Sequence, residues 1–216
     1  MKILILGTSG KCGQWVTRYA RERGHEITSI VRAQSMQKLK NTDGVIKGEV
    51  LDEGLLTSAA EGQHAVISTL GLNRAGPLPW ARLESPPDLV QRVMATLASV
   101  CTQPDSPRLV WLSAGGVGQS KQSASLPVRT LIRMGNVGVA FRDLEAAERI
   151  MGQAQAESVP VRPVTLLNGE SSRRAAPISR YTMFSTVRRS AVARWMLDVA
   201  DGTCKLDTNP MLLGTV

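Results

Sequence analysis

A short apolar run opens the chain, and glycines follow it at a regular spacing. Ile3 to Leu6 are all apolar, which is typical of a strand buried on both faces of a parallel sheet. Gly7, Gly10 and Gly13 come next, and apolar residues then recur at helical spacing (Trp15, Val16, Tyr19 and Ala20). The pattern predicts a strand, a glycine turn and a helix in direct succession.

The same alternation of short apolar runs and helical patterns continues along the chain. It predicts further strands at Ile27–Val31, Val45–Lys47, Val66–Leu70, Leu109–Leu112 and Val161–Leu167, and a short last strand at Cys204–Leu206. Helices are expected around Ser35–Leu39, before Gly62, from Asp88 to Cys101, across Leu144–Met151 and at Ala191–Val199. This order predicts an α/β fold with a doubly wound parallel sheet, in one Rossmann-like domain over residues 1–216.

The three glycines have a chemical reason at this place. Gly7 lets the chain turn sharply off the strand, and Gly10 has no side chain to keep a pyrophosphate from the backbone. Gly13 lets the helix pack closely, so that phosphates face the free N–H groups at its start. The spacing is G-x-x-G-x-x-G, and a tight turn alone would also explain it. Its place between a strand and a helix favours nucleotide binding.

Arg32 follows the second predicted strand, about 20 residues after the glycine turn. In a dinucleotide-binding unit this position meets the adenosine ribose, where an acidic residue would accept from the 2′-hydroxyl of NAD. An arginine cannot accept a hydrogen bond, but it can pair with a 2′-phosphate. We therefore predict NADP as the cofactor; the alternative is an ordinary solvated arginine at the end of a strand.

Composition narrows the classes of partner. The 216 residues are 43% hydrophobic, enough for a proper core, and carry a formal net charge of +8, which favours anionic ligands. Aromatic residues make up only 4%, which argues against a stacking platform for nucleic acid. No stretch is long and apolar enough to span a membrane. We expect a cytoplasmic protein that acts on a small molecule.

Cysteines and histidines are too few and too scattered for other chemistries. Three widely separated cysteines (Cys12, Cys101 and Cys204) indicate neither a disulfide framework nor a zinc site. His25 and His64 fall at strand starts, on the edge of the sheet away from the predicted site. We predict structural roles for both, and therefore neither a metal site nor a Ser-His-Asp hydrolase.

Two loop regions and one serine are predicted near the carboxyl edge of the sheet, where open α/β folds bind ligands. Residues 71–87 are rich in Pro and Gly around Trp80, which could cover a flat substrate or simply pin the loop. Residues 171–189 are strongly basic and predict a loop or cap, either a solvated surface or a rim that attracts anions. Ser113, after the fifth strand, could orient a ligand or cap the strand end.

Taken together, the chain resembles the atypical short-chain dehydrogenases/reductases, in particular the NmrA-like and NAD(P)H-flavin (biliverdin-IX-beta) reductase group. The resemblance rests on matching segments in the same order along nearly the whole chain: Gly7-Thr8-Ser9-Gly10-Lys11-Cys12-Gly13, Ile30-Val31-Arg32, Gly48–Asp52, Ala65–Gly71, Ser113, Arg162-Pro163 through Leu166 to Gly169, and Ser190–Ala193. It is more specific for fold and cofactor than for substrate.

The resemblance implies a set of cofactor-binding residues. The turn residues Gly7, Thr8, Ser9, Gly10, Lys11, Cys12 and Gly13 would bind NADP, with Gly10 to Gly13 on the pyrophosphate, and Arg32 would hold the 2′-phosphate. Glu49 and Val50 would lie by the adenine, and Thr69, Leu70 and Gly71 by the adenosine ribose and backbone. Ser113 would be near the nicotinamide, as the one candidate catalytic residue.

The acid that typical short-chain dehydrogenases use is missing. These enzymes pass a proton through a Tyr-x-x-x-Lys pair, but Tyr19 is followed four places on by Arg23 and Tyr181 by Ser185. A pocket without an acid suits planar, electron-poor acceptors such as flavins, quinones or tetrapyrroles, and the positive charge favours an anionic one. The sequence therefore predicts an NADPH-dependent reductase. The alternative is a non-catalytic NADP-binding sensor or assembly factor; a nucleotide-sugar epimerase is a distant third.

Overall fold

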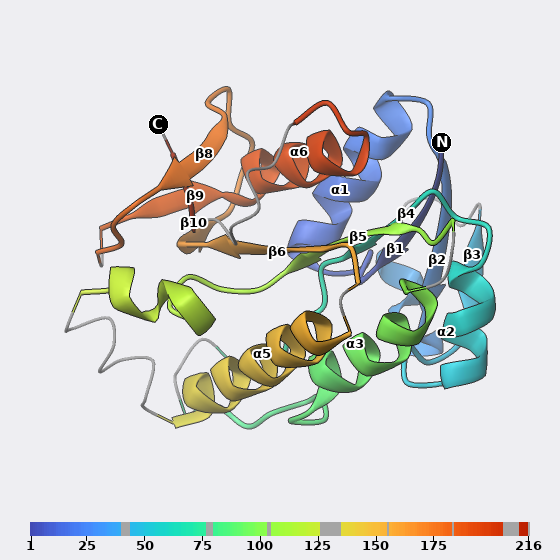
Figure 1. The fold of residues 1–216 in the computed structure, drawn as a ribbon, viewed down its shortest axis with the longest axis horizontal. Coiled ribbons are helices and arrows are strands. Elements are labelled where there is room, and N and C mark those ends of the chain that lie inside the picture. The colour runs from blue at the N-terminus through green and yellow to red at the C-terminus, as the bar shows by residue number, and fades with distance from the viewer. Residues whose placement is uncertain are drawn as a thin grey trace.

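The fold is built on one eight-stranded sheet (Figure 1). The computed structural model describes residues 1–39, 44–76, 80–102, 105–125, 135–154, 156–182, 184–204 and 212–215. The strand order is β3-β2-β1-β4-β5-β6-β10-β8, and every neighbouring pair is parallel except β10 and β8. The strands are β1 (Lys2–Leu6), β2 (Glu26–Val31), β3 (Val45–Lys47), β4 (Ala65–Ser68), β5 (Arg108–Leu112), β6 (Ser158–Pro163), β8 (Ala175–Ile178) and β10 (Leu212–Thr215).

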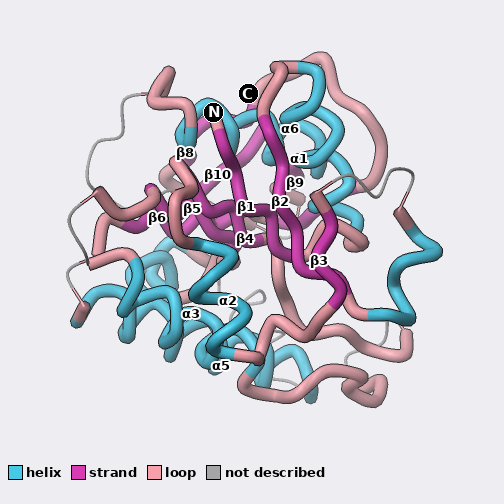
Figure 2. The backbone as a smooth tube through the Cα atoms, turned by 90° about the vertical axis from the view of Figure 1, so that its right-hand side faces the viewer, coloured by secondary structure: helices cyan, strands magenta, loops and turns pink. Residues whose placement is uncertain are grey.

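Helices cover both faces of this sheet, as Figures 1 and 2 show from two directions. One face carries α1 (Lys11–Glu22) and α6 (Arg189–Ala200), and the other carries α2 (Glu53–Ala60), α3 (Leu89–Val100) and α5 (Gly135–Gln153). Two short 3₁₀ helices, η1 (Ala33–Lys38) and η2 (Gly118–Ser123), follow β2 and β5. The predicted doubly wound α/β sheet is confirmed.

The middle of the sheet is buried on both sides because its strands are apolar throughout. Ile3, Leu4, Ile5 and Leu6 of β1 are completely inaccessible to solvent. Ile3 and Ile5 pack in the core beneath α1 and α6, whereas Leu4 and Leu6 pack in the core beneath α2, α3 and α5. Alternate residues of one apolar run thus serve opposite layers, as expected for a central strand of a parallel sheet.

The sixth predicted strand was wrong in its extent. In place of a single strand over Val161–Leu167, the structure has β6 (Ser158–Pro163) and β7 (Thr165–Leu167), with Val164 buried between them. β7 leaves the main sheet and pairs in parallel with β9 (Thr186–Arg188) in a separate two-stranded sheet. The residue types along Val161–Leu167 do not reveal that the two halves of the segment pair with different strands.

Three further expectations need correction. The helix expected around Ser35–Leu39 is the 3₁₀ helix η1, and the basic segment 171–189 contains β8 and β9, so it is not one continuous loop. Cys204 lies in a bend, residues 205 and 206 are outside the described residues, and the last strand is β10. Strand β10 pairs with both β8 and β6, and pairing between such distant segments is not visible in the local sequence pattern.

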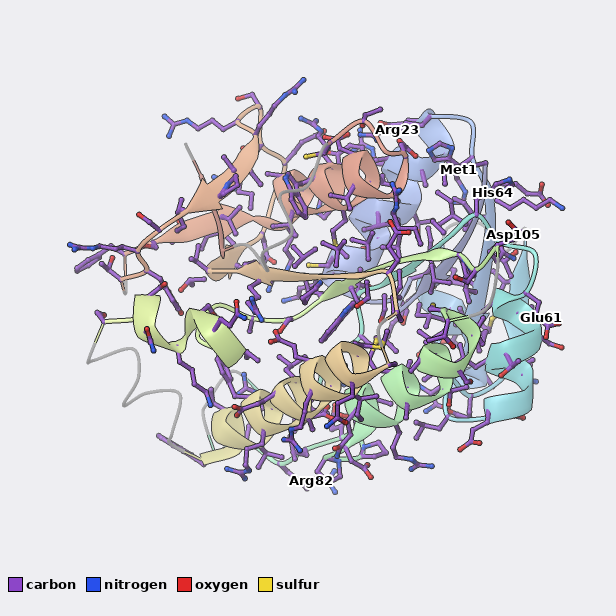
Figure 3. The ribbon with its side chains drawn as sticks, in the orientation of Figure 1. Met1, Arg23, Glu61, His64, Arg82 and Asp105 are labelled. Atoms are coloured by element: carbon purple, nitrogen blue, oxygen red, sulfur yellow. The ribbon has the colours of Figure 1, made fainter. Side chains whose placement is uncertain are left out.

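The amino ends of the strands form the edge of the sheet opposite the glycine turn. The Nδ1 atom of His64 accepts a hydrogen bond of 2.9 Å from the backbone N–H of Lys2, at the start of β1. His25 Nε2 lies 3.0 Å from a carboxylate oxygen of Asp201, just after α6. Met1, Arg23 and His64 accordingly lie at one end of the molecule in Figure 3. Both histidines thus contact structural partners at chain ends and helix ends.

Candidate cofactor-binding site

The glycine turn has the geometry that a phosphate requires. Gly7 adopts a φ of +86°, which side chains rarely allow, and Gly10 N–H donates to the Gly7 carbonyl over 2.9 Å. A Cβ atom at Gly13 would lie only 2.0 Å from Gly7 O, so only glycine lets α1 start this close to β1. Helix α1 has no side-chain cap and no acidic residue in its first turn. Its N–H groups are therefore available to an anion.

An open cleft of about 660 Å³ lies beside this turn, at the carboxyl ends of the central strands. Twelve of the thirteen cofactor residues expected from the resemblance line it: Gly7, Thr8, Ser9, Gly10, Lys11, Cys12, Arg32, Glu49, Val50, Thr69, Leu70 and Gly71. Gly13 is not a lining residue because it is packed against the turn. The structure brings these residues together, and their contacts with a cofactor stay a prediction.

The cleft floor is stabilised by its own hydrogen bonds. Thr69 Oγ1 donates to Leu6 O over 3.0 Å and so ties the end of β4 to the end of β1. Thr8 is only 3% exposed, and its Oγ1 has no hydrogen-bond partner among the described residues. A buried hydroxyl without a partner in a glycine turn fits a ligand group that accepts from it.

Thirteen further lining residues were not named individually by the sequence reasoning, although Leu72, Asn73, Ser85, Pro86 and Arg189 lie in the two segments predicted near the site. They come from the ends of β2 and β5, from the segment after β4, from β7 and from the start of α6: Ile30, Val31, Ser35, Lys38, Leu51, Leu72, Asn73, Ser85, Pro86, Leu89, Leu112, Leu166 and Arg189. Most are apolar or weakly polar residues whose types indicate nothing by themselves. The available signal was their place in the segments that follow the strands at the carboxyl edge of the sheet.

Arg189 and Cys12 meet at the end of the cleft that Leu112 and Leu166 also line. Arg189 donates to Leu166 O over 3.2 Å and to Asn168 Oδ1 over 2.7 Å, which fixes its guanidinium at the start of α6. Burial raises the pKa of the Cys12 thiol to about 11, although the neighbouring Arg189 acts in the opposite direction. This end therefore combines apolar walls, a neutral thiol and a positive charge.

Ser113 takes part in a buried polar network behind the cleft. It is 5% exposed, is not among the lining residues, and donates a hydrogen bond of 2.7 Å to Glu148 Oε1 of α5. Arg162 of β6, 2% exposed, donates its Nε–H to the same oxygen over 2.7 Å and also pairs with Glu148 Oε2. The serine hydroxyl already has an acceptor, and its predicted role near the nicotinamide stays a prediction.

Neither tyrosine of the chain lines the cleft. Tyr19 is packed between α1 and α6, where its hydroxyl donates to Glu170 over 3.3 Å. Tyr181 lies after β8 and forms an isolated bridge with Ala124. No tyrosine is therefore placed to supply a proton at the cleft.

The two predicted loop regions differ in their relation to the cleft. Leu72, Asn73, Ser85 and Pro86 of segment 71–87 line it, but Trp80 does not. The Trp80 side chain is 69% exposed and packs in neither core formed by the described residues. Of the basic segment 171–189, Arg189 lines the cleft, whereas Arg173, Arg174 and Arg180 are exposed. The anion-attracting rim is thus reduced to one arginine at the cleft itself.

No group of three or more His, Cys, Asp or Glu side chains among the described residues lies close enough to hold a metal ion. None of the described helices has the length and the apolar character that crossing a bilayer would take.

The fold and the cleft define a Rossmann-like domain with a glycine turn at the carboxyl edge of its sheet. Comparison of the sequence with known families agrees: the NAD(P)H-binding family matches residues 7–203. The chain therefore belongs to this family, whose members are atypical short-chain dehydrogenases/reductases.

Solved structures and curated relatives are consistent with this assignment. The fold is similar to ChuY, an anaerobillin reductase from Escherichia coli O157:H7 (TM-score 0.75, 20% identity, 100% of this chain and 97% of that chain). It is also similar to a short-chain dehydrogenases/reductase (wide type) from Veillonella parvula in complex with NADP (TM-score 0.71, 16% identity, 99% and 93%). The probable pinoresinol-lariciresinol reductase 3 of Arabidopsis thaliana is 32% identical over 74 residues; the match covers 32% of this chain and 24% of that relative.

Proposed function

We propose that the protein is an NADPH-dependent reductase that transfers a hydride to a planar, electron-poor acceptor such as a flavin, a quinone or a tetrapyrrole. The observation that carries this proposal is the composition of the cleft end formed by Cys12, Leu112, Leu166 and Arg189. Its walls suit a flat apolar ring system, and its single cation suits an acidic substituent on that ring. It has no tyrosine to protonate an ordinary ketone.

The residues of the cleft have distinct tasks in this proposal. NADPH supplies the hydride, which is the difficult chemistry. The N–H groups at the start of α1 and the hydroxyl of Thr8 would hold the pyrophosphate, and Leu112 and Leu166 would keep water from the reacting rings. Arg189, fixed by its two hydrogen bonds, would orient an anionic acceptor. An acceptor that carries the new electrons on ring nitrogens or oxygens can take its proton from water.

Two further observations support a reductase of this kind. ChuY, with the same fold, is an anaerobillin reductase, which acts on a tetrapyrrole. The chain's net charge of +8 favours an anionic acceptor. A preference for NADP over NAD is supported by Arg32 in the cleft and by the Veillonella structure that holds NADP.

The second candidate is a non-catalytic NADP-binding sensor or assembly protein. It is favoured by one observation, that both tyrosines lie in structural contacts away from the cleft. In this case the cofactor would act as a ligand that changes binding to a partner, and it would not be consumed.

The two candidates are separated by following NADPH absorbance after adding FMN, a soluble quinone or a linear tetrapyrrole, each with an enzyme-free control. A reductase consumes NADPH with at least one acceptor, and consumption depends on protein concentration. A matched Arg189→Gln variant should raise KM for a carboxylated acceptor while leaving NADPH binding within about twofold. Tight NADPH binding without consumption of cofactor by any acceptor would contradict the reductase and favour the sensor.

A further inference from the structure

Positive charge is concentrated in one segment at one end of the molecule. Residues 171–189 contain five arginines and no aspartate or glutamate, so this segment carries more than half of the chain's net charge of +8. It runs through β8 and β9, which lie at the left of Figure 1, at the opposite end from α2 and β3. Four of its arginines are exposed: Arg173, Arg174, Arg180 and Arg188. We call the exposed part of this segment, together with Leu167 beside it, the basic surface.

Three of these arginines have no partner within the fold. In the described parts of the chain, the side chains of Arg173, Arg174 and Arg180 form no ion pair and no side-chain hydrogen bond. The nearest carboxylate along the chain, Glu170, already lies 3.7 Å from Arg194. Like charges without partners repel one another, and an anionic partner outside the chain would relieve that repulsion.

Large apolar side chains are exposed on the same surface. Phe184 is 93% exposed and lies in the turn that leads into β9. Leu167 is 41% exposed and lies directly opposite Arg188 in the β7–β9 pair. Their neighbours Leu166 and Val187 pack in the core, so alternate residues of this pair face outward. The basic surface therefore combines arginines with a protruding aromatic ring.

We propose that the basic surface docks the protein on an anionic lipid membrane, with Phe184 inserted among the headgroups and the exposed arginines on the lipid phosphates. A bilayer interface takes up an aromatic ring that leaves water, while its anionic headgroups attract guanidinium groups. A surface of one sign of charge would repel a second copy of itself. One exposed aromatic residue in the described part of the surface does not make a stacking row for nucleic acid.

The basic surface adjoins the end of the cleft proposed for the acceptor. Leu166 and Arg189 line the cleft, and their chain neighbours Leu167 and Arg188 are exposed. A protein docked through this surface would hold that end of the cleft near the membrane, where an apolar acceptor such as a quinone is concentrated. Docking does not depend on hydride transfer, so the inference goes beyond the proposed function.

The test is sedimentation of the full chain with vesicles of phosphatidylcholine alone or of equal parts phosphatidylcholine and phosphatidylglycerol. The wild type should bind the anionic vesicles only, and more weakly as salt is added. The double variant Arg173→Gln with Arg174→Gln should bind them at least about tenfold more weakly, since each arginine near an anionic surface contributes about fivefold. The control is Arg21→Gln with Arg92→Gln, which removes two exposed arginines of α1 and α3 and so gives the same net charge.

Insertion of the aromatic ring is tested by a second pair of variants. Phe184→Ser should weaken binding to the anionic vesicles about tenfold, as expected when a buried ring is lost. Trp80→Ser is the control, because Trp80 is also an exposed aromatic residue but lies in the segment after β4. Equal binding by these two variants would contradict insertion of Phe184.

The other outcomes separate docking on lipid from its alternatives. A wild type that binds neither kind of vesicle, or both equally, would overturn the proposal. Equal losses in the two double arginine variants would also overturn it, because net charge alone would then explain binding. Binding to polyglutamate without binding to vesicles would assign the surface to an acidic protein partner. A protein that docks on vesicles through Phe184 but never consumes NADPH would retain this proposal and lose the reductase function.

Discussion

The hydroxyl of Ser113 donates a hydrogen bond of 2.7 Å to Glu148, a residue that lies 35 positions further along the chain. Arg162 donates to the same carboxylate, so Glu148 is an ionised acceptor. The hydroxyl proton of Ser113 is therefore already used in the hydrogen bond to Glu148. Ser113 Oγ can therefore only accept from a ligand, for example from an amide N–H. This restricts the predicted role of Ser113 at the nicotinamide to that of a hydrogen-bond acceptor.

Replacing Ser113 by alanine separates a ligand role from a structural one. If Ser113 accepts a hydrogen bond from the cofactor or acceptor, Ser113→Ala should lower kcat/KM about tenfold, the worth of one such bond. Ser120→Ala is the control, because Ser120 is equally buried and bonds only to backbone atoms. Both variants should lose about 1 kcal/mol of unfolding free energy in urea. Equal steady-state kinetics for the two variants would reduce Ser113 to a strand-end cap.

Gly10 and Gly13 should respond differently to the same added methyl group. A Cβ at Gly10 meets Gly7 O at 3.2 Å, a contact that a small shift relieves, but it would occupy the approach of the pyrophosphate. Gly10→Ala should therefore fold and bind NADP at least about tenfold more weakly. A Cβ at Gly13 lies 2.0 Å from Gly7 O, so Gly13→Ala should lose about 3 kcal/mol of unfolding free energy.

Gly152→Ala is the control for both variants, because a Cβ there meets nothing within 4 Å and the residue lies in α5. Thermal unfolding and calorimetric NADP titration give the two readouts. A Gly10→Ala protein with unchanged NADP affinity would argue against a pyrophosphate at this turn.

Arg32→Asp tests the cofactor preference directly. A carboxylate at this position repels a 2′-phosphate but can accept from a 2′-hydroxyl, so NADPH should bind at least about tenfold more weakly while NADH binding changes little. Fluorescence titration of both cofactors gives the ratio, and Arg21→Asp controls for the lost charge. Equal losses for NADPH and NADH would mean that Arg32 is only a solvated arginine.

The rate at which the cysteines are alkylated depends on pH, and its change on adding NADP reports on occupation of the cleft. Burial raises the pKa values of Cys12 and Cys101 to about 11, and only the thiolate reacts, so both thiols should react slowly at neutral pH and faster as the pH rises. Cys12 lines the cleft and Cys101 does not. NADP should therefore slow iodoacetamide labelling of Cys12 severalfold and leave Cys101 unchanged, as measured by peptide mass spectrometry. Similar protection of both cysteines would indicate a general loss of flexibility in the protein and not occupation of the cleft.

The sequence by itself determined the alternation of strands and helices from β1 to β5, the glycine turn and twelve of the residues that line the cleft. Ile3–Leu6 had to form a buried strand because it is apolar on both faces, and Gly7, Gly10 and Gly13 had to follow because the chain turns there against its own backbone. Such features arise from neighbours in the sequence, which a local pattern records. For the same reason the break between β6 and β7 was missed, since it depends on which strands they pair with.

Only the tertiary structure decided how distant residues meet. Arg82 shares a cavity with Arg32 because its own segment, 80–85, pairs with segment 71–76. Arg189 reaches Cys12 because α6 packs against α1. Ser113 meets Glu148 because α5 lies over the end of β5. Each contact joins residues far apart in the sequence, and its energy comes from packing and charge that exist only once the sheet has formed. The glycine turn and Arg32 could thus be predicted from the sequence, whereas the meeting of Arg189 with Cys12 and of Ser113 with Glu148 could not.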